Sequence, residues 1–182
     1  EPGVENTCKK RFEWQLGKLP FGYDHKYIYS HIGFNMKITD MQAACGLGQL
    51  ENLENFIEKR KTNVLFLKKQ LTELQDEIHL PEAEINSDPS WFGFPITIKK
   101  ESKFRRTDLI KKLTESKIGT RLLFSGNLTK QPAYLSKKFI VHGKLDTTDL
   151  IMNNTFWVGI QPAIGEEELS FIAQTIKKFF KK

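Results

Sequence analysis

The stretch LENLENFIEKRKTNVLFLKKQLTEL, residues 50–74, has the clearest periodicity in the chain. Apolar side chains recur in it in steps of three and four, which is the spacing of one face of an α-helix. The stripe consists of Leu50, Leu53, Ile57, Val64, Leu67, Leu71 and Leu74, and Arg60 interrupts it. We predict a long helix that packs this stripe into a core and bends near residues 52–55. A guanidinium on such a seam needs an acidic or carbonyl partner, so we expect Arg60 to have one, with a structural ion pair favoured over a ligand contact.

Upstream of this stretch, Thr39 and Gln42 match the pattern of a capping box. The Thr39 hydroxyl can accept a hydrogen bond from the backbone of Gln42, and the Gln42 side chain can reach back. Asp40 in the first turn suits the positive end of the helix dipole. A helix is therefore expected to start here. The preceding residues 1–38, rich in Gly, Pro and aromatic residues, are expected to form a long, mostly irregular segment.

Downstream, the elements alternate between strands and helices. We predict strands at residues 91–98, 119–124 and 155–160, and helices at residues 106–117, 146–152 and about 166–180. Acidic residues lead the last of these helices and lysines end it, as the helix dipole favours. This order predicts an α/β or α+β fold in which helices cover a small sheet.

The bulk composition narrows the classes of protein. The chain has 182 residues, a formal charge of +6 and two cysteines, Cys8 and Cys45. No apolar run approaches the roughly 20 residues of a membrane span, no signal peptide is visible, and no nucleic-acid motif accompanies the lysines. We therefore expect a cytoplasmic protein that binds neither membrane nor nucleic acid. The chain begins with Glu1-Pro2-Gly3 rather than Met, so we expect it to be cut from a longer protein.

The residues alone do not identify a reaction. His25 and His31 could contribute to a metal site, but their spacing fits no helical pair and a structural role is favoured. The guanidinium of Arg121 could bind the phosphate oxygens of a substrate or form a structural salt bridge. Asn127 is a second polar candidate of the same kind.

Longer motifs carry a resemblance to a known family. The segment YDHKYIYSHIGFNMKITDMQAA, residues 23–44, followed by Gln49-Leu50 and Arg60, resembles the hallmark of the DegT/StrS sugar aminotransferase family. The longer match, including residues 23–27 (YDHKY), resembles its CDP-4-keto-6-deoxyglucose 3-dehydratase branch, and residues 126–128, 131–134 and 153–157 (GNL, QPAY and NNTFW) fit the same branch. The resemblance covers nearly the whole chain.

This resemblance implies the C-terminal part of a pyridoxal-phosphate-dependent transferase of fold type I. Residues 1–45 would be the end of the large cofactor domain, including a loop that crosses the dimer interface. Residues 46–80 would be a long linking helix, and residues 81–182 the C-terminal small domain. The parent would be a homodimer that acts on a CDP-sugar in deoxysugar and lipopolysaccharide biosynthesis.

The resemblance also implies the cofactors and their ligands. The parent would use pyridoxamine phosphate and a [2Fe–2S] centre, with electrons from an NADH-dependent iron–sulfur flavoprotein reductase. Asn35 would contact the partner's cofactor phosphate, although an Asn in a turn is the alternative. Cys8 would be the last of four cluster ligands, with an ordinary free thiol as the alternative.

Two other functions stay open at this point. No catalytic residue is expected in this chain, and on its own we expect it to bind no cofactor and to be inactive. A pyridoxal-phosphate-dependent sugar aminotransferase is the first alternative, and the residue at the upstream Schiff-base position, His or Lys, would decide. An inactive dimerisation or interaction module is the second.

Overall fold

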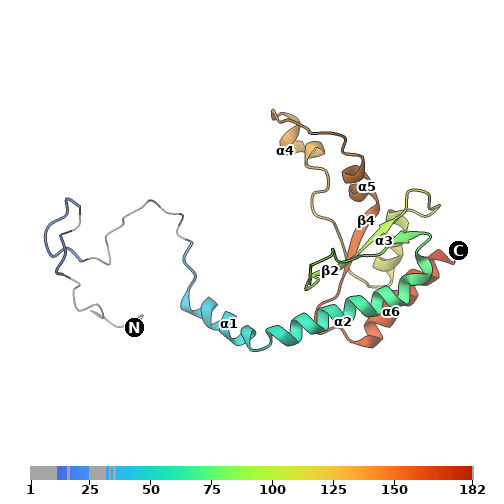
Figure 1. The fold of residues 1–182 in the computed structure, drawn as a ribbon, viewed down its shortest axis with the longest axis horizontal. Helices are drawn as coiled ribbons and strands as arrows, with labels where there is room; N and C mark the ends of the chain where they lie inside the picture. The colour runs from blue at the N-terminus through green and yellow to red at the C-terminus, as the bar shows by residue number, and fades with distance from the viewer. Residues whose placement is uncertain (1–11, 16, 25–31, 33, 35, 182) are drawn as a thin grey trace. The chain divides into compact units, whose positions relative to one another are not determined.

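The computed structural model describes residues 12–15, 17–24, 32, 34 and 36–181. The chain divides into two compact units, Glu1–Gly46 and Leu47–Lys182, each of which is described by itself. Figure 1 labels the helices and strands along the chain. Among the described residues, no helix combines the length and apolar character needed to cross a membrane.

The helix predicted to start near Thr39 is confirmed as α1 (Asp40–Leu50). The capping box is present, because the backbone N–H of Thr39 donates to Gln42 Oε1 at 2.8 Å and that of Gln42 donates to Thr39 Oγ1 at 3.3 Å. None of the residues of α1 is buried.

The stripe of residues 50–74 forms two helices rather than one. Helix α1 ends at Leu50, α2 (Leu53–Leu71) follows, and a short 3-10 turn, η2 (Thr72–Leu74), ends the run. The break therefore lies at the predicted bend. Val64, Leu67, Leu71 and Leu74 are buried, as expected, whereas the prediction was wrong for Leu50 and Leu53, which are exposed. The reason is that the buried part of α2 begins only at Asn63.

Four short strands form one antiparallel sheet in the order β1-β2-β4-β3. They are β1 (Ile78–His79), β2 (Gly93–Ile98), β3 (Thr120–Leu122) and β4 (Thr155–Gly159). The last three lie within the predicted strands, and β1 has only two residues. Helices α3 (Arg106–Glu115), α5 (Asp146–Asn154) and α6 (Glu166–Phe180) confirm the three predicted helices. The connection from β3 to α5 also contains η3 (Leu128–Lys130) and α4 (Pro132–Leu135).

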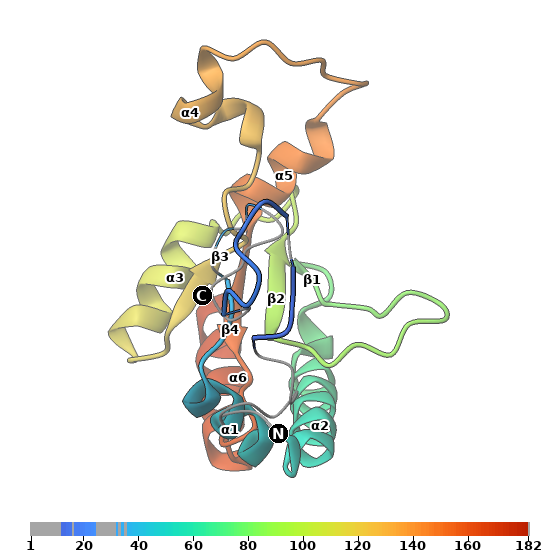
Figure 2. The same cartoon turned by 90° about the vertical axis from the view of Figure 1, so that its left-hand side faces the viewer.

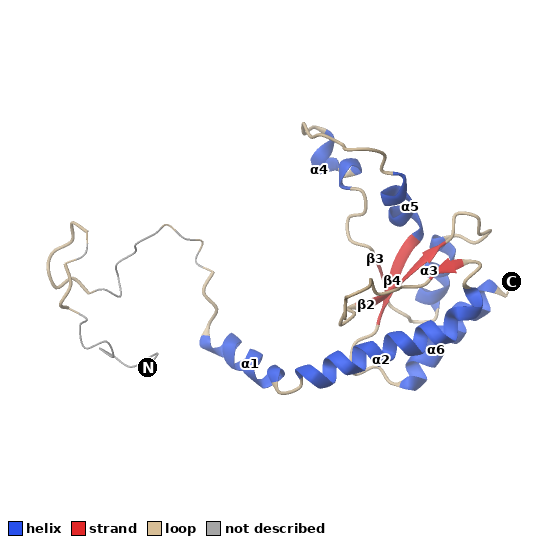
Figure 3. Cartoon of the chain, in the orientation of Figure 1, coloured by secondary structure: helices blue, strands red, loops and turns tan. Residues whose placement is uncertain are grey.

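One face of this sheet carries the core. Side chains alternate along β2, so Phe94, Ile96 and Ile98 are buried while the residues between them are partly exposed. Figures 2 and 3 show α2 and α6 side by side along the sheet, with α3 next to them. These helices contribute Leu67 and Leu71, Ile172 and Ile176, and Leu109 and Leu113 to the core. The expected fold, a small sheet covered by helices, is confirmed, and the opposite face of the sheet is left for other contacts.

Candidate functional site

The sequence predicted four site residues, of which the structure describes two. Asn35 and Cys8 lie outside the described residues, as do His25 and His31. Arg121 is in the middle of β3, and Asn127 follows in the connection to α5. These two residues lie on different local features.

Arg121 belongs to a row of side chains on the face of the sheet opposite the core. In the sheet register Arg121 pairs with Trp157, and Trp157 pairs with Pro95. Directly paired residues project from the same face, so the three side chains lie next to one another. The Arg121 Nη1 donates to the backbone oxygen of Thr120 at 3.1 Å. Within the part of the chain that the structure describes it has no acidic partner, so its charge is available to an anion.

An apolar hollow of about 200 Å³ lies on the same face, around Trp157. Its lining is Trp91, Phe92, Gly93, Pro95, Leu123, Phe124 and Trp157. We call this the aromatic hollow. The rings of Phe92 and Trp157 pack at a centroid distance of 5.2 Å, tilted by 60°. The indole N–H of Trp157 donates to the backbone oxygen of Leu122 at 3.2 Å, which fixes the orientation of the ring.

Arg60 holds the backbone of two residues that line the aromatic hollow, Trp91 and Phe92. Its Nη1 donates to the backbone oxygens of Trp91 at 3.1 Å and Phe92 at 3.4 Å. The expectation that Arg60 needs an acidic or carbonyl partner is therefore confirmed, and its partners are carbonyls. The favoured ion pair was wrong. Through these carbonyls Arg60 connects helix α2 to the segment before β2.

Asn127 lies in a polar network that ties the connection after β3 to helix α5. Its side-chain amide donates to Asp149 Oδ1 at 2.7 Å, and its side-chain oxygen accepts from the backbone and hydroxyl of Thr129 at 3.0 and 2.7 Å. Lys130 donates to the other carboxylate oxygen of Asp149 at 2.8 Å. The hydrogen bond from Lys130, and then that from Asn127, hold the pKa of Asp149 below its usual value.

Asn127 itself is almost completely buried, with 2% of its surface exposed. The residue before it, Gly126, has φ +63, and a Cβ built there would lie 2.4 Å from Met152 Cγ. Only glycine combines this backbone conformation with such close packing. The geometry makes Asn127 a residue that positions its loop, and a direct contact with substrate stays a proposal.

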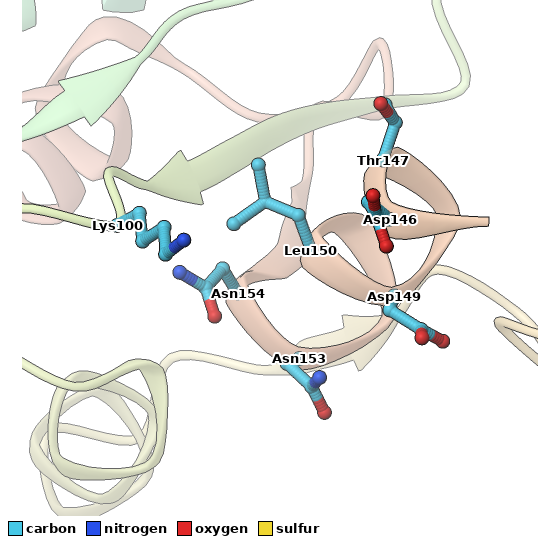
Figure 4. Close-up of a pocket in the computed structure, with 7 residues that line it drawn as sticks. All are labelled: Lys100, Asp146, Thr147, Asp149, Leu150, Asn153 and Asn154. Atoms are coloured by element: carbon cyan, nitrogen blue, oxygen red, sulfur yellow. The ribbon is translucent and has the colours of Figure 1, made fainter. Parts of the chain in front are cut away.

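Helix α5 borders a second, open hollow of about 580 Å³. Figure 4 shows Lys100 near Asn154 at one end, and Asp146 and Thr147 at the other. The Asn154 amide donates to the backbone oxygen of Ile98 at 2.8 Å and so joins α5 to the end of β2. This hollow is lined by charges of both signs and gives no clear preference for one ligand class.

The described residues contain no site for the iron–sulfur centre that the resemblance implies. They include no cluster of three or more His, Cys, Asp or Glu side chains that could hold a metal, and Cys45 is an exposed thiol. The aromatic hollow has no cation in its lining for the phosphate of pyridoxamine phosphate. The second hollow combines the cation Lys100 with the carboxylates of Asp146 and Asp149, which would repel that phosphate. No chemical step is therefore assigned to either group in this part of the chain.

The fold and the open face define the class of protein. Solved structures with this architecture include an Escherichia coli GDP-4-keto-6-deoxy-D-mannose-3-dehydratase with bound hydrated pyridoxal phosphate. It is 23% identical, with a TM-score of 0.76 over 94% of this chain and 46% of that chain. The chain therefore has the fold of pyridoxal-phosphate-dependent aminotransferases, and the expectation of this fold is confirmed.

The sequence comparisons are more specific. The chain belongs to the DegT/DnrJ/EryC1/StrS aminotransferase family, whose profile matches residues 15–177. It is 56% identical over 179 residues to the lipopolysaccharide biosynthesis protein RfbH of Salmonella typhimurium, covering 98% of this chain and 41% of that protein. It is 44% identical over 182 residues to a dTDP-4-dehydro-2,6-dideoxy-D-glucose 3-dehydratase of Saccharopolyspora spinosa, covering 100% and 39%. The chain thus spans about two fifths of the length of these relatives.

Proposed function

We propose that this chain is the C-terminal portion of a pyridoxamine-phosphate-dependent nucleotide-sugar 3-dehydratase. The complete enzyme would remove the C3 hydroxyl of a CDP-4-keto-6-deoxyhexose in deoxysugar and O-antigen biosynthesis. The observation that carries the proposal is the 44% identity over the whole chain to a relative named as a sugar 3-dehydratase. The choice of CDP rests on the motif resemblance of residues 23–27, 126–128, 131–134 and 153–157.

A sugar aminotransferase is the second candidate, because the family also contains transaminases. The relatives named as a dTDP-4-amino-4,6-dideoxy-D-glucose transaminase and a GDP-perosamine synthase are 25% and 26% identical to this chain. The higher identity to the 3-dehydratase favours deoxygenation. The residue at the Schiff-base position of the complete protein separates the two: His supports the dehydratase and Lys the aminotransferase.

In this proposal the chain's own residues bind and position the substrate. When bound, pyridoxamine phosphate supplies an amine for the C4 ketone and a ring that accepts electrons. Arg121 would contact the substrate diphosphate, because a guanidinium matches phosphate oxygens. Asn127 would hold the loop after β3 in place through Asp149. Asn35 would donate to the cofactor phosphate of a partner subunit, and Cys8 would complete a [2Fe–2S] centre that receives electrons from a flavoprotein reductase.

The activity test uses the complete, cytoplasmically expressed protein with CDP-4-keto-6-deoxyglucose, pyridoxamine phosphate, the reductase and NADH. The expected result is loss of the C3 hydroxyl, which mass spectrometry of the sugar detects. Transfer of an amino group from L-glutamate to the sugar, with the C3 hydroxyl retained, would instead establish the aminotransferase.

A substitution tests the cofactor contact separately. Asn35→Ala in the complete protein removes the hydrogen bond that the neutral amide donates to an anionic oxygen. A hydrogen bond to a charged group is worth about 1.5–3 kcal/mol. We therefore expect roughly 10- to 150-fold weaker retention of pyridoxamine phosphate, measured by equilibrium dialysis. Unchanged affinity would contradict the role of Asn35.

A further inference from the structure

We propose that the aromatic hollow binds the nucleobase of the nucleotide-sugar, with the indole of Trp157 as the stacking platform and Arg121 beside it as the diphosphate contact. The inference rests on the proposed function for its substrate class, a nucleotide-sugar. It adds a particular surface to that function, namely the open face of the sheet near β3 and β4.

The indole of Trp157 is held in a fixed orientation and can serve as a flat stacking surface. A Cβ built on Gly93 would lie 2.3 Å from Cε3 of Trp157, so the ring lies against the bare backbone of β2. The hydrogen bond from the indole N–H to Leu122 fixes the ring in its plane. Gly93 is the first residue of β2, and a glycine in a strand commonly marks a place where another group approaches closely. Because Gly93 has no side chain, one face of the indole can pack against the backbone of β2. The opposite face is then left for the hollow that Trp157 lines.

The walls of the aromatic hollow are held in place by their own contacts. Phe92 packs at a tilt against the indole, and Arg60 holds the backbone on either side of that ring through the carbonyls of Trp91 and Phe92. Phe124 is 84% exposed and has φ +47, an uncommon conformation for a residue with a side chain. A backbone held in such a conformation at a surface hollow is typical of a functional segment.

The size and the apolar lining of the aromatic hollow suit a single aromatic ring. At about 200 Å³ the hollow is smaller than the roughly 300–1,000 Å³ of a pocket for a whole drug-sized ligand. Its lining contains no charged residue. Those properties fit one flat aromatic ring rather than a sugar or a phosphate. Every nucleobase has a π-face, so the platform supplies affinity for a base without choosing among bases.

A positive charge, that of Arg121, lies next to the indole ring of Trp157. Arg121 is directly opposite Trp157 in the register of β3 and β4, where paired Cβ atoms are about 4.5–5.5 Å apart. It is exposed and free of acidic partners among the residues that the structure describes. An aromatic platform beside a free guanidinium is complementary to a nucleoside diphosphate, in which a base and an anionic group are joined by a ribose.

The experiment measures binding of CDP and of inorganic pyrophosphate to the complete protein by calorimetry. Trp157→Leu should weaken CDP binding about 5- to 150-fold, the range of one base stacked on an aromatic ring, and leave pyrophosphate binding unchanged. Arg121→Gln should weaken both ligands. Phe124→Ala, at an exposed position, should weaken CDP alone and does not depend on the packing of Trp157.

The two glycines of one register pair provide the matched control. Gly93→Ala displaces the indole and should behave as Trp157→Leu does, whereas a Cβ on Gly159 meets nothing within 4 Å and Gly159→Ala should bind CDP normally. CDP affinity unchanged in Trp157→Leu, Gly93→Ala and Phe124→Ala would overturn the proposal. If those variants alter sedimentation or melting instead, the face is an interface with the rest of the protein or a second copy.

These outcomes are separable from those of the proposed function. Turnover of the CDP-ketosugar with an unchanged KM in Trp157→Leu would refute the nucleobase site and leave the dehydratase standing. CDP binding that depends on Trp157, in a protein that does not dehydrate the sugar, would do the reverse.

Discussion

At the scale of single residues, two adjacent arginines at the start of α3 have opposite roles. Arg105 lies on the surface and forms two hydrogen bonds to the Asp108 carboxylate, at 2.8 and 3.1 Å, which raise its pKa. Arg106 turns inward, and its Nη1 donates to the backbone oxygens of Met152 at 2.7 Å and Thr155 at 3.3 Å. These carbonyls lie at the C-terminal end of α5, where the helix dipole favours a cation. Burial lowers the pKa of Arg106.

This difference predicts different costs of removing each arginine. Arg106→Met leaves carbonyls without their charged donor, and we expect about 1.5–3 kcal/mol of lost stability in urea unfolding. Arg106 Nε is buried without an acceptor among the described atoms, and its removal offsets a part of that loss. Arg105→Met removes an exposed ion pair and should cost clearly less stability than Arg106→Met. Equal effects of the two substitutions would contradict the assignment.

The Asp149 network predicts a dependence of stability on pH. The pKa of Asp149 lies below its ordinary 3.8 in the fold, through hydrogen bonds from Lys130 and then Asn127. A lowered pKa means that the carboxylate contributes stability fully above the unfolded pKa and loses it as the pH falls through the lower folded pKa. The stability difference between the wild type and Asp149→Asn should therefore be greatest near neutral pH and shrink below pH 3.8.

Melting temperatures measured from neutral pH down to about pH 3 check this dependence. In a Lys130→Met background the effect of Asp149→Asn should be smaller, since residues of one network are coupled. A pH-independent difference between Asp149 and Asn in the wild-type background would contradict the role of the network.

At the scale of elements, helix α2 contributes to the core only through its second half. Leu67 has no exposed surface, whereas Leu65 on the same helix is 66% exposed. Leu67→Ala should therefore lose about 2–5 kcal/mol of unfolding free energy, because the deletion leaves a cavity between α2 and the sheet. Leu65→Ala keeps the helix and opens no cavity, so we expect a change within about 0.5 kcal/mol. Urea denaturation of both variants measures the difference, and similar costs would show that α2 packs on another face.

Periodicity predicted the elements that bury a regular face, and it did not predict the short ones. Helix α6 has the expected bounds, Glu166–Phe180, because a strongly amphipathic pattern with acidic residues first and lysines last leaves little freedom. Strand β1 has two residues, and α4 has four, too few for any period to be detected. The exposure of Leu50 and Leu53 was also beyond prediction, because a stripe does not indicate where its covering partners end.

The candidate site was predicted only in part for the same reason. Arg121 was recognisable as a guanidinium that could bind phosphate, and Asn127 as a second polar candidate, but Asp149, the partner of Asn127 on α5, had no local signal. The aromatic hollow was missed entirely. It is formed by Gly93 and Trp157, which are 64 positions apart, and only the register of β2 with β4 brings the indole over the glycine. A single aromatic residue on the open face of an amphipathic strand was the available hint.

At the scale of the whole molecule, the second unit exposes more apolar surface than its fold needs. Phe92, Phe124, Leu135 and Ile140 are each at least 68% exposed, and all belong to the open face or the connection from β3 to α5. Large exposed apolar side chains grouped on one region are typical of surfaces that contact another protein part or a ligand. This agrees with a chain that spans about two fifths of its relatives, 41% of one and 39% of another.

The last prediction concerns the isolated chain. The resemblance places the Schiff-base position upstream of this chain, and the chain spans 41% and 39% of two of its relatives, so we expect chemistry at the sugar C4 and C3 positions to depend on residues outside it. We expect the purified 182-residue chain to show no turnover of CDP-4-keto-6-deoxyglucose with pyridoxamine phosphate, reductase and NADH supplied, while the complete protein is active in the same assay. Circular dichroism of the chain shows whether it is folded when it is assayed. Dehydration by the folded chain alone would place the reactive groups within these residues and would refute both this prediction and the division of roles on which it is based.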